Sequence, residues 1–144
     1  MQNQKLAQWV SAQTNNPPPS TVRFRLSGEL PWGFDIAMMR VVASDLYRVW
    51  LNGQPVGISE DWQGVNWRVT GIAKPGLNTI EVEVRTRQHA QVYEASMLCE
   101  LAVADKQGVK LVQILSDERT STDQGTPRLA KSSFVEEWID YLPA

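Results

Sequence analysis

The stretch LYRVWLNGQPVGIS, residues 46–59, decides the fold class of this chain. Its first half alternates as a β-strand with one buried side does, with Tyr47, Val49 and Leu51 on an apolar face and Arg48 and Trp50 on the other. Asn52-Gly53 is a pair that favours the positive φ angles of a type I′ hairpin turn. Pro55 has no N–H to donate to a ladder, so the return strand is expected at a sheet edge or irregular near its start. The stretch therefore predicts a β-hairpin.

The same period of two continues through most of the chain. Residues 21–27 and 79–87 alternate apolar with polar or charged side chains, and the predicted inward-facing residues are Val22, Phe24, Leu26, Ile80, Val82 and Val84. Residues 37–44 are a more continuous apolar run, which suits a central strand. Residues 92–117 indicate a long hairpin around the polar turn at 105–108. About eight short strands with almost no strong helical pattern predict an all-β, antiparallel jelly-roll β-sandwich.

The two ends of the chain are less regular. Three consecutive prolines at 17–19 interrupt regular pairing, and before them Leu6, Trp9 and Val10 fit either a helical stripe or a short strand. Near the other end, Ser133 with Glu136 three residues later resembles a capping box and predicts a helical turn. Residues 117–128 are polar and predict a loop. We expect one domain over residues 1–144, with an N-terminal strand and the proline-rich connector of residues 1–20 packing on the sandwich.

Composition narrows the function classes. The 144 residues carry a net charge of −2, so there is no basic excess to neutralise nucleic-acid phosphates. No apolar run approaches the roughly 20 residues that cross a bilayer, and residues 1–13 do not resemble a signal peptide. These features predict neither a nucleic-acid nor a membrane partner, and they indicate no compartment.

The residues that carry catalysis in other proteins are sparse here. Cys99 is the single cysteine and sits in an apolar stretch, which is typical of a buried strand residue. His89 is the single histidine and sits in a polar stretch expected to be a loop. The adjacent carboxylates, Glu60 with Asp61 and Glu136 with Glu137, do not predict the facing pair that glycoside hydrolysis needs, because neighbours on a strand point to opposite faces. No catalytic residue is predicted.

Several turns resemble a known family. The matching segments are Trp50-Leu51-Asn52-Gly53, then Val56-Gly57, then Arg68-Val69-Thr70, and then residues 73–78 with Pro75-Gly76 and Asn78. In this order they resemble the galactose-binding-like β-sandwich, found as an accessory domain in α-L-rhamnosidases and β-galactosidase-type glycoside hydrolases. The resemblance covers nearly the whole chain and favours a strand around Trp9. It implies a carbohydrate partner or an adjoining catalytic module, but not an enzyme, because such domains adjoin a catalytic module and this sequence contains none.

The tryptophan-rich segment after the hairpin is the predicted ligand site. Trp62 lies in a polar, glycine-containing stretch, the composition of a loop in which an indole stacks on a sugar and polar side chains bind its hydroxyls. The predicted binding residues are Glu60, Asp61, Trp62, Gln63 and Asn66, joined by Trp32 if the two loops meet at one end of the sandwich. Trp67 is expected in the core, and Trp50 on the face opposite Val49.

Two functions remain open from the sequence. The first is non-catalytic carbohydrate recognition, and the second is a structural or protein-interaction module of the same fold. No cofactor is predicted, although Asp45, Asp61 and Asn66 could supply oxygen ligands to calcium.

Overall fold

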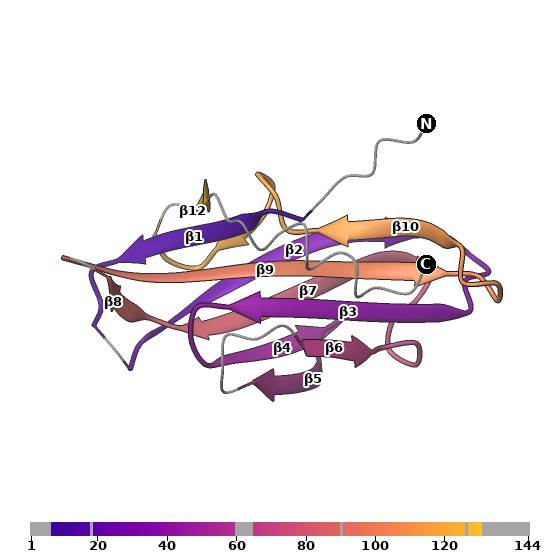
Figure 1. Cartoon of the computed structure of the whole chain (residues 1–144), viewed down its shortest axis with the longest axis horizontal. Coiled ribbons are helices and arrows are strands. Elements are labelled where there is room, and N and C mark those ends of the chain that lie inside the picture. Colours follow the sequence, from indigo (N-terminus) through magenta and orange to yellow (C-terminus); the bar gives the residue numbers. More distant parts are fainter. Residues whose placement is uncertain (1–6, 18, 60–64, 90, 126, 131–144) are drawn as a thin grey trace.

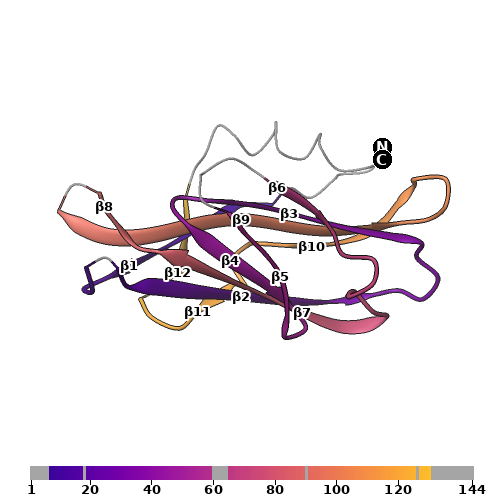
Figure 2. The ribbon, with the colours of Figure 1, turned by 90° about the horizontal axis from the view of Figure 1, so that it is seen from below.

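The computed structural model describes residues 7–17, 19–59, 65–89, 91–125 and 127–130, which form two antiparallel β-sheets packed face to face. The strands run along the long axis of the molecule (Figure 1), and the view from below separates the layer of β3 and β9 from the layer of β2 and β7 (Figure 2). None of the described residues is helical, and none forms a helix fit to span a membrane. The predicted all-β sandwich is confirmed.

The larger sheet has seven strands in the described part of the chain. They are β1 (Trp9–Thr14), β3 (Ile36–Ala43), β6 (Val65–Arg68), β8 (Arg87–His89), β9 (Val92–Ala104), β10 (Lys110–Leu115) and β12 (Pro127–Ala130), with the main order β12-β1-β9-β3-β6. Strand β9 is long enough for two partners on each edge: β1 and β10 share one edge, and β3 and β8 share the other.

The second sheet has five described strands in the order β11-β2-β7-β4-β5. They are β2 (Thr21–Leu30), β4 (Tyr47–Leu51), β5 (Gln54–Ser59), β7 (Gly76–Arg85) and β11 (Ser121–Thr122). One edge of the sandwich is therefore formed by β1, β12 and β11, and the other by β5 and β6.

The core lies where the period-two pattern predicts it. All nine predicted inward-facing residues of the second sheet are buried: Val22, Phe24, Leu26, Tyr47, Val49, Leu51, Ile80, Val82 and Val84. They pack against the alternate residues of β1, β3 and β9 that face them in the same cluster. This continuous apolar interior, rather than a disulfide, supplies the main stabilisation.

The Asn-Gly hairpin forms as predicted. Asn52 and Gly53 have φ angles of 53° and 79°, the left-handed values that a type I′ turn requires. Pro55 lies on β5, an edge strand, and the register of β5 shifts between Val49 and Trp50. Both expectations for this strand, an edge position and irregularity, are confirmed.

A second turn is joined to this hairpin by two side-chain amides, those of Asn52, which is partly buried, and Asn78. The Asn78 side chain, which is fully buried, accepts hydrogen bonds from the Lys74 backbone N–H (3.0 Å) and from Asn52 Nδ2 (2.9 Å). Its Nδ2 donates to the carbonyls of Lys74 (2.7 Å) and Gly76 (3.0 Å). Asn52 Oδ1 in turn accepts from the Thr79 N–H at 2.9 Å. The Asn-Gly and Pro-Gly-x-Asn motifs are thus one hydrogen-bonded unit.

The outer faces of the two sheets differ in chemistry. On the second sheet, Glu81 and Glu83 pair with arginines of the neighbouring β2: Arg23 with Glu83 at 3.1 Å and Arg25 with Glu81 at 3.2 Å. The larger sheet instead carries a second apolar cluster, which includes Val42, Leu98, Ala102 and Leu115.

Three expectations are corrected by the strand boundaries. The alternating residues 79–87 do not form one strand, because β7 ends at Arg85 and the chain crosses to β8 in the other sheet. His89 lies in β8 rather than in a loop. The polar segment 117–128 contains β11 and the start of β12, because edge strands can pair through backbone groups without apolar side chains. The helical turn expected from Ser133 lies outside the described residues.

Candidate binding cleft

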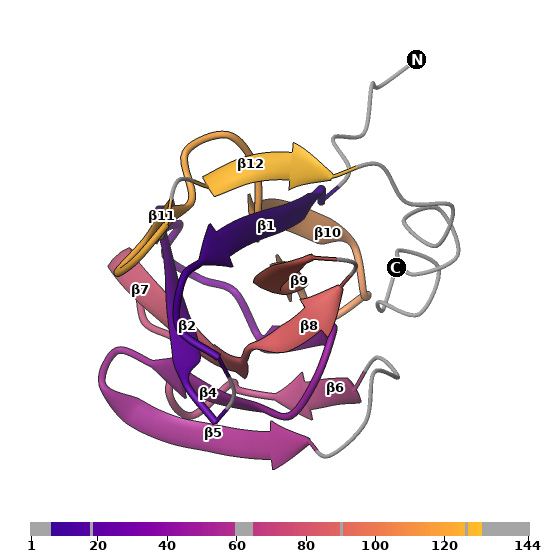
Figure 3. The same cartoon turned by 90° about the vertical axis from the view of Figure 1, so that its left-hand side faces the viewer.

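An open cleft of about 820 Å³ lies at one end of the sandwich, beside the edge formed by β1 and β12. We call it the end cleft; its lining residues are Gln13, Thr14, Asn15, Asn16, Gln91, Val92, Tyr93, Gly125 and Arg128. Figure 3 looks onto this end, with β12 and β1 above β8 and β9. The volume is within the range of small-molecule sites.

The cleft forms where three separate segments end together. Thr14, the last residue of β1, pairs with Tyr93 near the start of β9, so the β1 end and the first residues of β9 are neighbours. Arg128 pairs with Ser11 on the other side of β1. Cross-strand pairing therefore brings residues more than 100 positions apart to one rim.

A close backbone contact holds the rim in place. Gly125 has a φ of 75°, and a Cβ at this position would lie 2.1 Å from the carbonyl oxygen of Gln13. Next to it, Gln124 Oε1 accepts hydrogen bonds from Thr14 Oγ1 (2.7 Å) and Asn16 Nδ2 (2.8 Å), and Gln124 Nε2 donates to the Thr21 carbonyl. The turn at 123–125 is thereby tied to both strands that flank the connector.

The lining combines amides, one aromatic ring and one cation. Four side-chain amides belong to the lining, and three of them, those of Gln13, Asn15 and Gln91, are exposed and form no side-chain hydrogen bond within the described part of the chain. Tyr93 is half-buried and contributes a ring, whereas Arg128 is exposed. None of the nine lining residues is Asp or Glu. Amides pair with vicinal hydroxyls as donor and acceptor, and a ring stacks on apolar C–H faces.

The predicted site residues do not line this cleft. Trp32 is 86% exposed in the loop before β3, and its neighbour Leu30 pairs with Gly76 at the opposite end of the sandwich. Glu60, Asp61, Trp62 and Gln63 lie outside the described residues, and for Asn66 only the backbone is described, in β6 opposite Arg40. The strands that flank this segment are β5 and β6. They form one edge of the sandwich, whereas β1 and β12 lie at the opposite edge. Binding by these residues stays a prediction.

The three other tryptophans in the described part of the chain have structural surroundings. Trp67 is partly buried and packs against the core. A Cβ atom added to Gly57 would lie only 2.3 Å from the nearest carbon atoms of the Trp67 ring, so the indole occupies the space that the glycine leaves. Trp50 lies on the outer face as predicted, with the Arg23 guanidinium 4.7 Å from the centre of its ring. Trp9 packs against the outer cluster of the larger sheet.

The single cysteine is not a nucleophile candidate. Cys99 is fully buried on β9, as predicted, and burial raises the pKa of its thiol well above the usual value. Of the three predicted calcium ligands, only Asp45 has a described side chain. Its Oδ1 forms an ion pair with Arg85 at 2.8 Å. In the described ranges, no group of three or more His, Cys, Asp or Glu side chains is arranged to hold a metal ion.

Sequence reasoning missed the end cleft. Its one local signal is the run Gln13 to Asn16, in which three of four residues carry amides directly before the prolines. The other contributors, Tyr93 and Arg128, come from distant segments whose meeting depends on strand register.

Solved structures with this fold include parts of sugar-processing and sugar-binding proteins. The α-L-rhamnosidase of Aspergillus terreus matches with a TM-score of 0.66 and 23% identity over 82% of this chain. The Streptomyces avermitilis α-L-rhamnosidase, solved with L-rhamnose, matches with a TM-score of 0.63 and 20% identity over 85%. The lectin of Pleurotus ostreatus, solved with GalNAc, matches with a TM-score of 0.60 and 19% identity over 84%. Neither the protein-family models nor the curated proteins include a match to this chain.

These matches establish the fold that the turn motifs predicted, a galactose-binding-like β-sandwich. The chain spans 17% of the Aspergillus enzyme, 14% of the Streptomyces enzyme and 37% of the lectin. It therefore corresponds to one small part of each.

Proposed function

We propose that this chain is a non-catalytic saccharide-binding module and that the end cleft is its binding site. The observation that carries the proposal is the composition of the cleft: an open site lined by four amides, the Tyr93 ring and Arg128. Saccharides present alternating hydroxyls and C–H faces, which amides and a ring complement. The fold shared with a lectin supports the assignment by analogy alone.

The lining favours binding over hydrolysis. Glycoside hydrolysis uses two carboxyl groups facing each other across the scissile bond, and no lining residue of the end cleft has one. The likeness to α-L-rhamnosidases is also confined to less than a fifth of each enzyme.

A protein-interaction module is the second candidate. Trp32, Leu77 and Val109 are 86%, 60% and 56% exposed, and all three flank turns at the end opposite the cleft. Of the five large apolar side chains that are exposed in the described ranges, these three share one end of the domain, which favours a contact there. A partner protein would then contact this opposite end and leave the end cleft free.

The test is calorimetric titration with a panel of neutral and acidic oligosaccharides. We expect Tyr93→Ala to weaken binding at least ten-fold, because it removes the stacking ring, while Trp32→Ala changes the affinity less than two-fold. Trp62→Ala tests the site predicted from sequence in the same assay. If Trp62→Ala abolishes binding and Tyr93→Ala does not, the site is in the segment 60–66 instead. If no saccharide binds and Trp32→Ala abolishes capture of a protein partner, the second candidate is correct.

A further inference from the structure

The arginines of this protein differ in whether a carboxylate neutralises them. Arg23, Arg25, Arg85 and Arg119 each form an ion pair, with Glu81 or Glu83, Glu81, Asp45 and Asp117 respectively. Arg128 forms none within the described ranges, and it is the arginine that lines the end cleft. The positive charge of Arg128 in the cleft is not part of a general excess of basic residues, because the net charge of the protein is −2.

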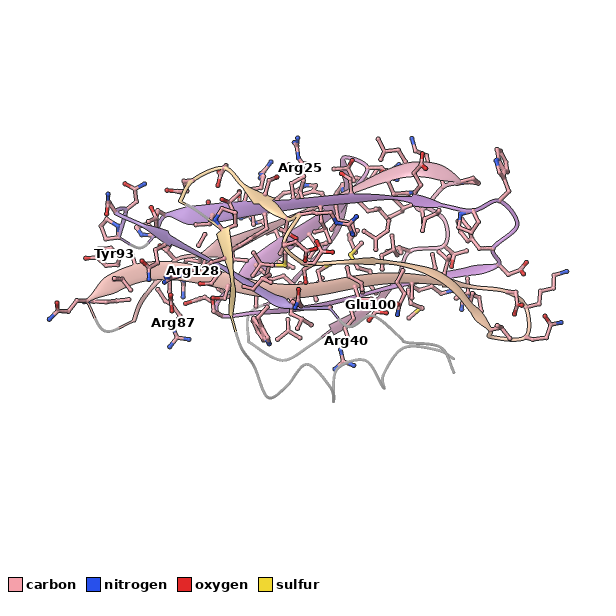
Figure 4. The ribbon with its side chains drawn as sticks, turned by 90° about the horizontal axis from the view of Figure 1, so that it is seen from above. Arg25, Arg40, Arg87, Tyr93, Glu100 and Arg128 are labelled. Atoms are coloured by element: carbon pink, nitrogen blue, oxygen red, sulfur yellow. The ribbon has the colours of Figure 1, made fainter. Side chains whose placement is uncertain are left out.

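Two carboxylates, Glu94 and Asp123, lie on elements beside the cleft but do not line it. Glu94 lies directly opposite Gln13 on β9, and on its other side Arg87 lies directly opposite Glu94 on β8. Asp123 Oδ1 accepts the backbone N–H of Arg23 at 2.8 Å. Tyr93, Arg128 and Arg87 lie toward the same end of the molecule, while Arg40 and Glu100 lie near its middle (Figure 4). An anionic ligand in the cleft would therefore meet one guanidinium and no lining carboxylate.

We infer that the end cleft takes a saccharide bearing an anionic group, with Arg128 binding the anion while the amides and Tyr93 bind the rest of the sugar. This rests on the proposed function and names the ligand class of its site. A guanidinium matches a carboxylate or a sulfate with two parallel N–H donors. Exposed amides of Gln13, Asn15 and Gln91 remain for hydroxyls.

The experiment compares a uronic-acid oligosaccharide with the same oligosaccharide after its carboxylates are reduced to alcohols. The wild-type protein should bind the acidic form about ten-fold more tightly, which equals about 1.4 kcal/mol, and the preference should shrink as salt is raised. Arg128→Gln should abolish the preference, because it removes the guanidinium that binds the anionic group. Arg128→Lys, which keeps the charge, should retain part of it.

Arg87→Gln is the matched control. Arg87 is an exposed arginine at the same end, but its guanidinium donates to the Ser44 carbonyl at 2.9 Å and it does not line the cleft. The preference for the acidic form should survive this substitution. A sulfated neutral oligosaccharide in parallel identifies the anion: equal binding assigns any anion, and weaker binding assigns a carboxylate.

The two proposals fail separately. Equal wild-type affinity for the acidic and reduced forms, or a preference that persists in Arg128→Gln, overturns the anion inference and leaves saccharide binding standing. Absence of binding to either form overturns saccharide binding and the inference with it.

Discussion

The two ends of the sandwich use the same side chain in opposite ways. At the turn end, the side-chain amides of Asn52 and Asn78 form hydrogen bonds with the protein's own backbone and with each other, and Asn78 has no exposed surface. At the cleft end, Asn15 and its neighbours hold their amides at an exposed rim. The turn end is architecture, whereas the cleft end keeps hydrogen-bonding capacity for something else.

Where an amide forms its hydrogen bonds decides whether a polar motif indicates fold or ligand binding. An amide whose donors and acceptors are all used inside the fold contributes to stability, and its loss leaves buried groups unpaired. Removal of an exposed amide from a concave site changes the free energy of unfolding little, and its effect is expected only in the affinity for a ligand. The Pro-Gly-x-Asn motif, which carries the family resemblance, therefore reports fold and not ligand.

The largest expected effect is that of Asn78→Ala. The substitution removes four hydrogen bonds at a buried position, and at about 1 kcal/mol for each we expect a loss of about 4 kcal/mol in the free energy of unfolding. Urea denaturation measures it. Asn15→Ala is the control and should change stability by less than about 0.5 kcal/mol. Comparable losses in the two variants would break the contrast between the ends.

A smaller effect is expected for Gly125→Ala. The new Cβ would combine a left-handed φ with a 2.1 Å approach to the Gln13 carbonyl, for a cost on the order of 3 kcal/mol. Gly33→Ala is the matched control, since Gly33 also has a positive φ of 84° but open space around it, and should cost about 1 kcal/mol. The same denaturation curves give both values. If Gly33→Ala lowered the free energy of unfolding as much as Gly125→Ala, the close contact between Gly125 and the Gln13 carbonyl would not contribute to stability.

Most of the fold follows from local patterns in the sequence. Alternation identifies the buried face of β2, β4 and β7 because a half-covered sheet leaves a period of two. The boundary at Thr86 is hidden because Arg87 continues the alternation of β7 although the chain has already crossed to the other sheet. Strands β8, β11 and β12 are only two to four residues long, so their pairing depends on neighbours that no local window contains.

The candidate site could not be predicted in the same way. Polar residues such as Gln91 and Arg128 look like solvent-exposed loop residues until the register of β1 with β9 and β12 is known. Tryptophans attract attention for the opposite reason, since an indole is conspicuous in any sequence. Trp67 illustrates the risk, because its ring fills the space above Gly57.

The most direct test of the central claim is a nuclear magnetic resonance titration with a uronic-acid oligosaccharide. Side-chain amides and the six indole N–H groups give separate signals, so one experiment reports on every candidate location. We predict shifts in the side-chain amides of Gln13, Asn15 and Gln91, with the Trp32 and Trp62 indoles unchanged. Shifts confined to the Trp32 or Trp62 indole, with these amides unmoved, would contradict the assignment of the end cleft as the binding site.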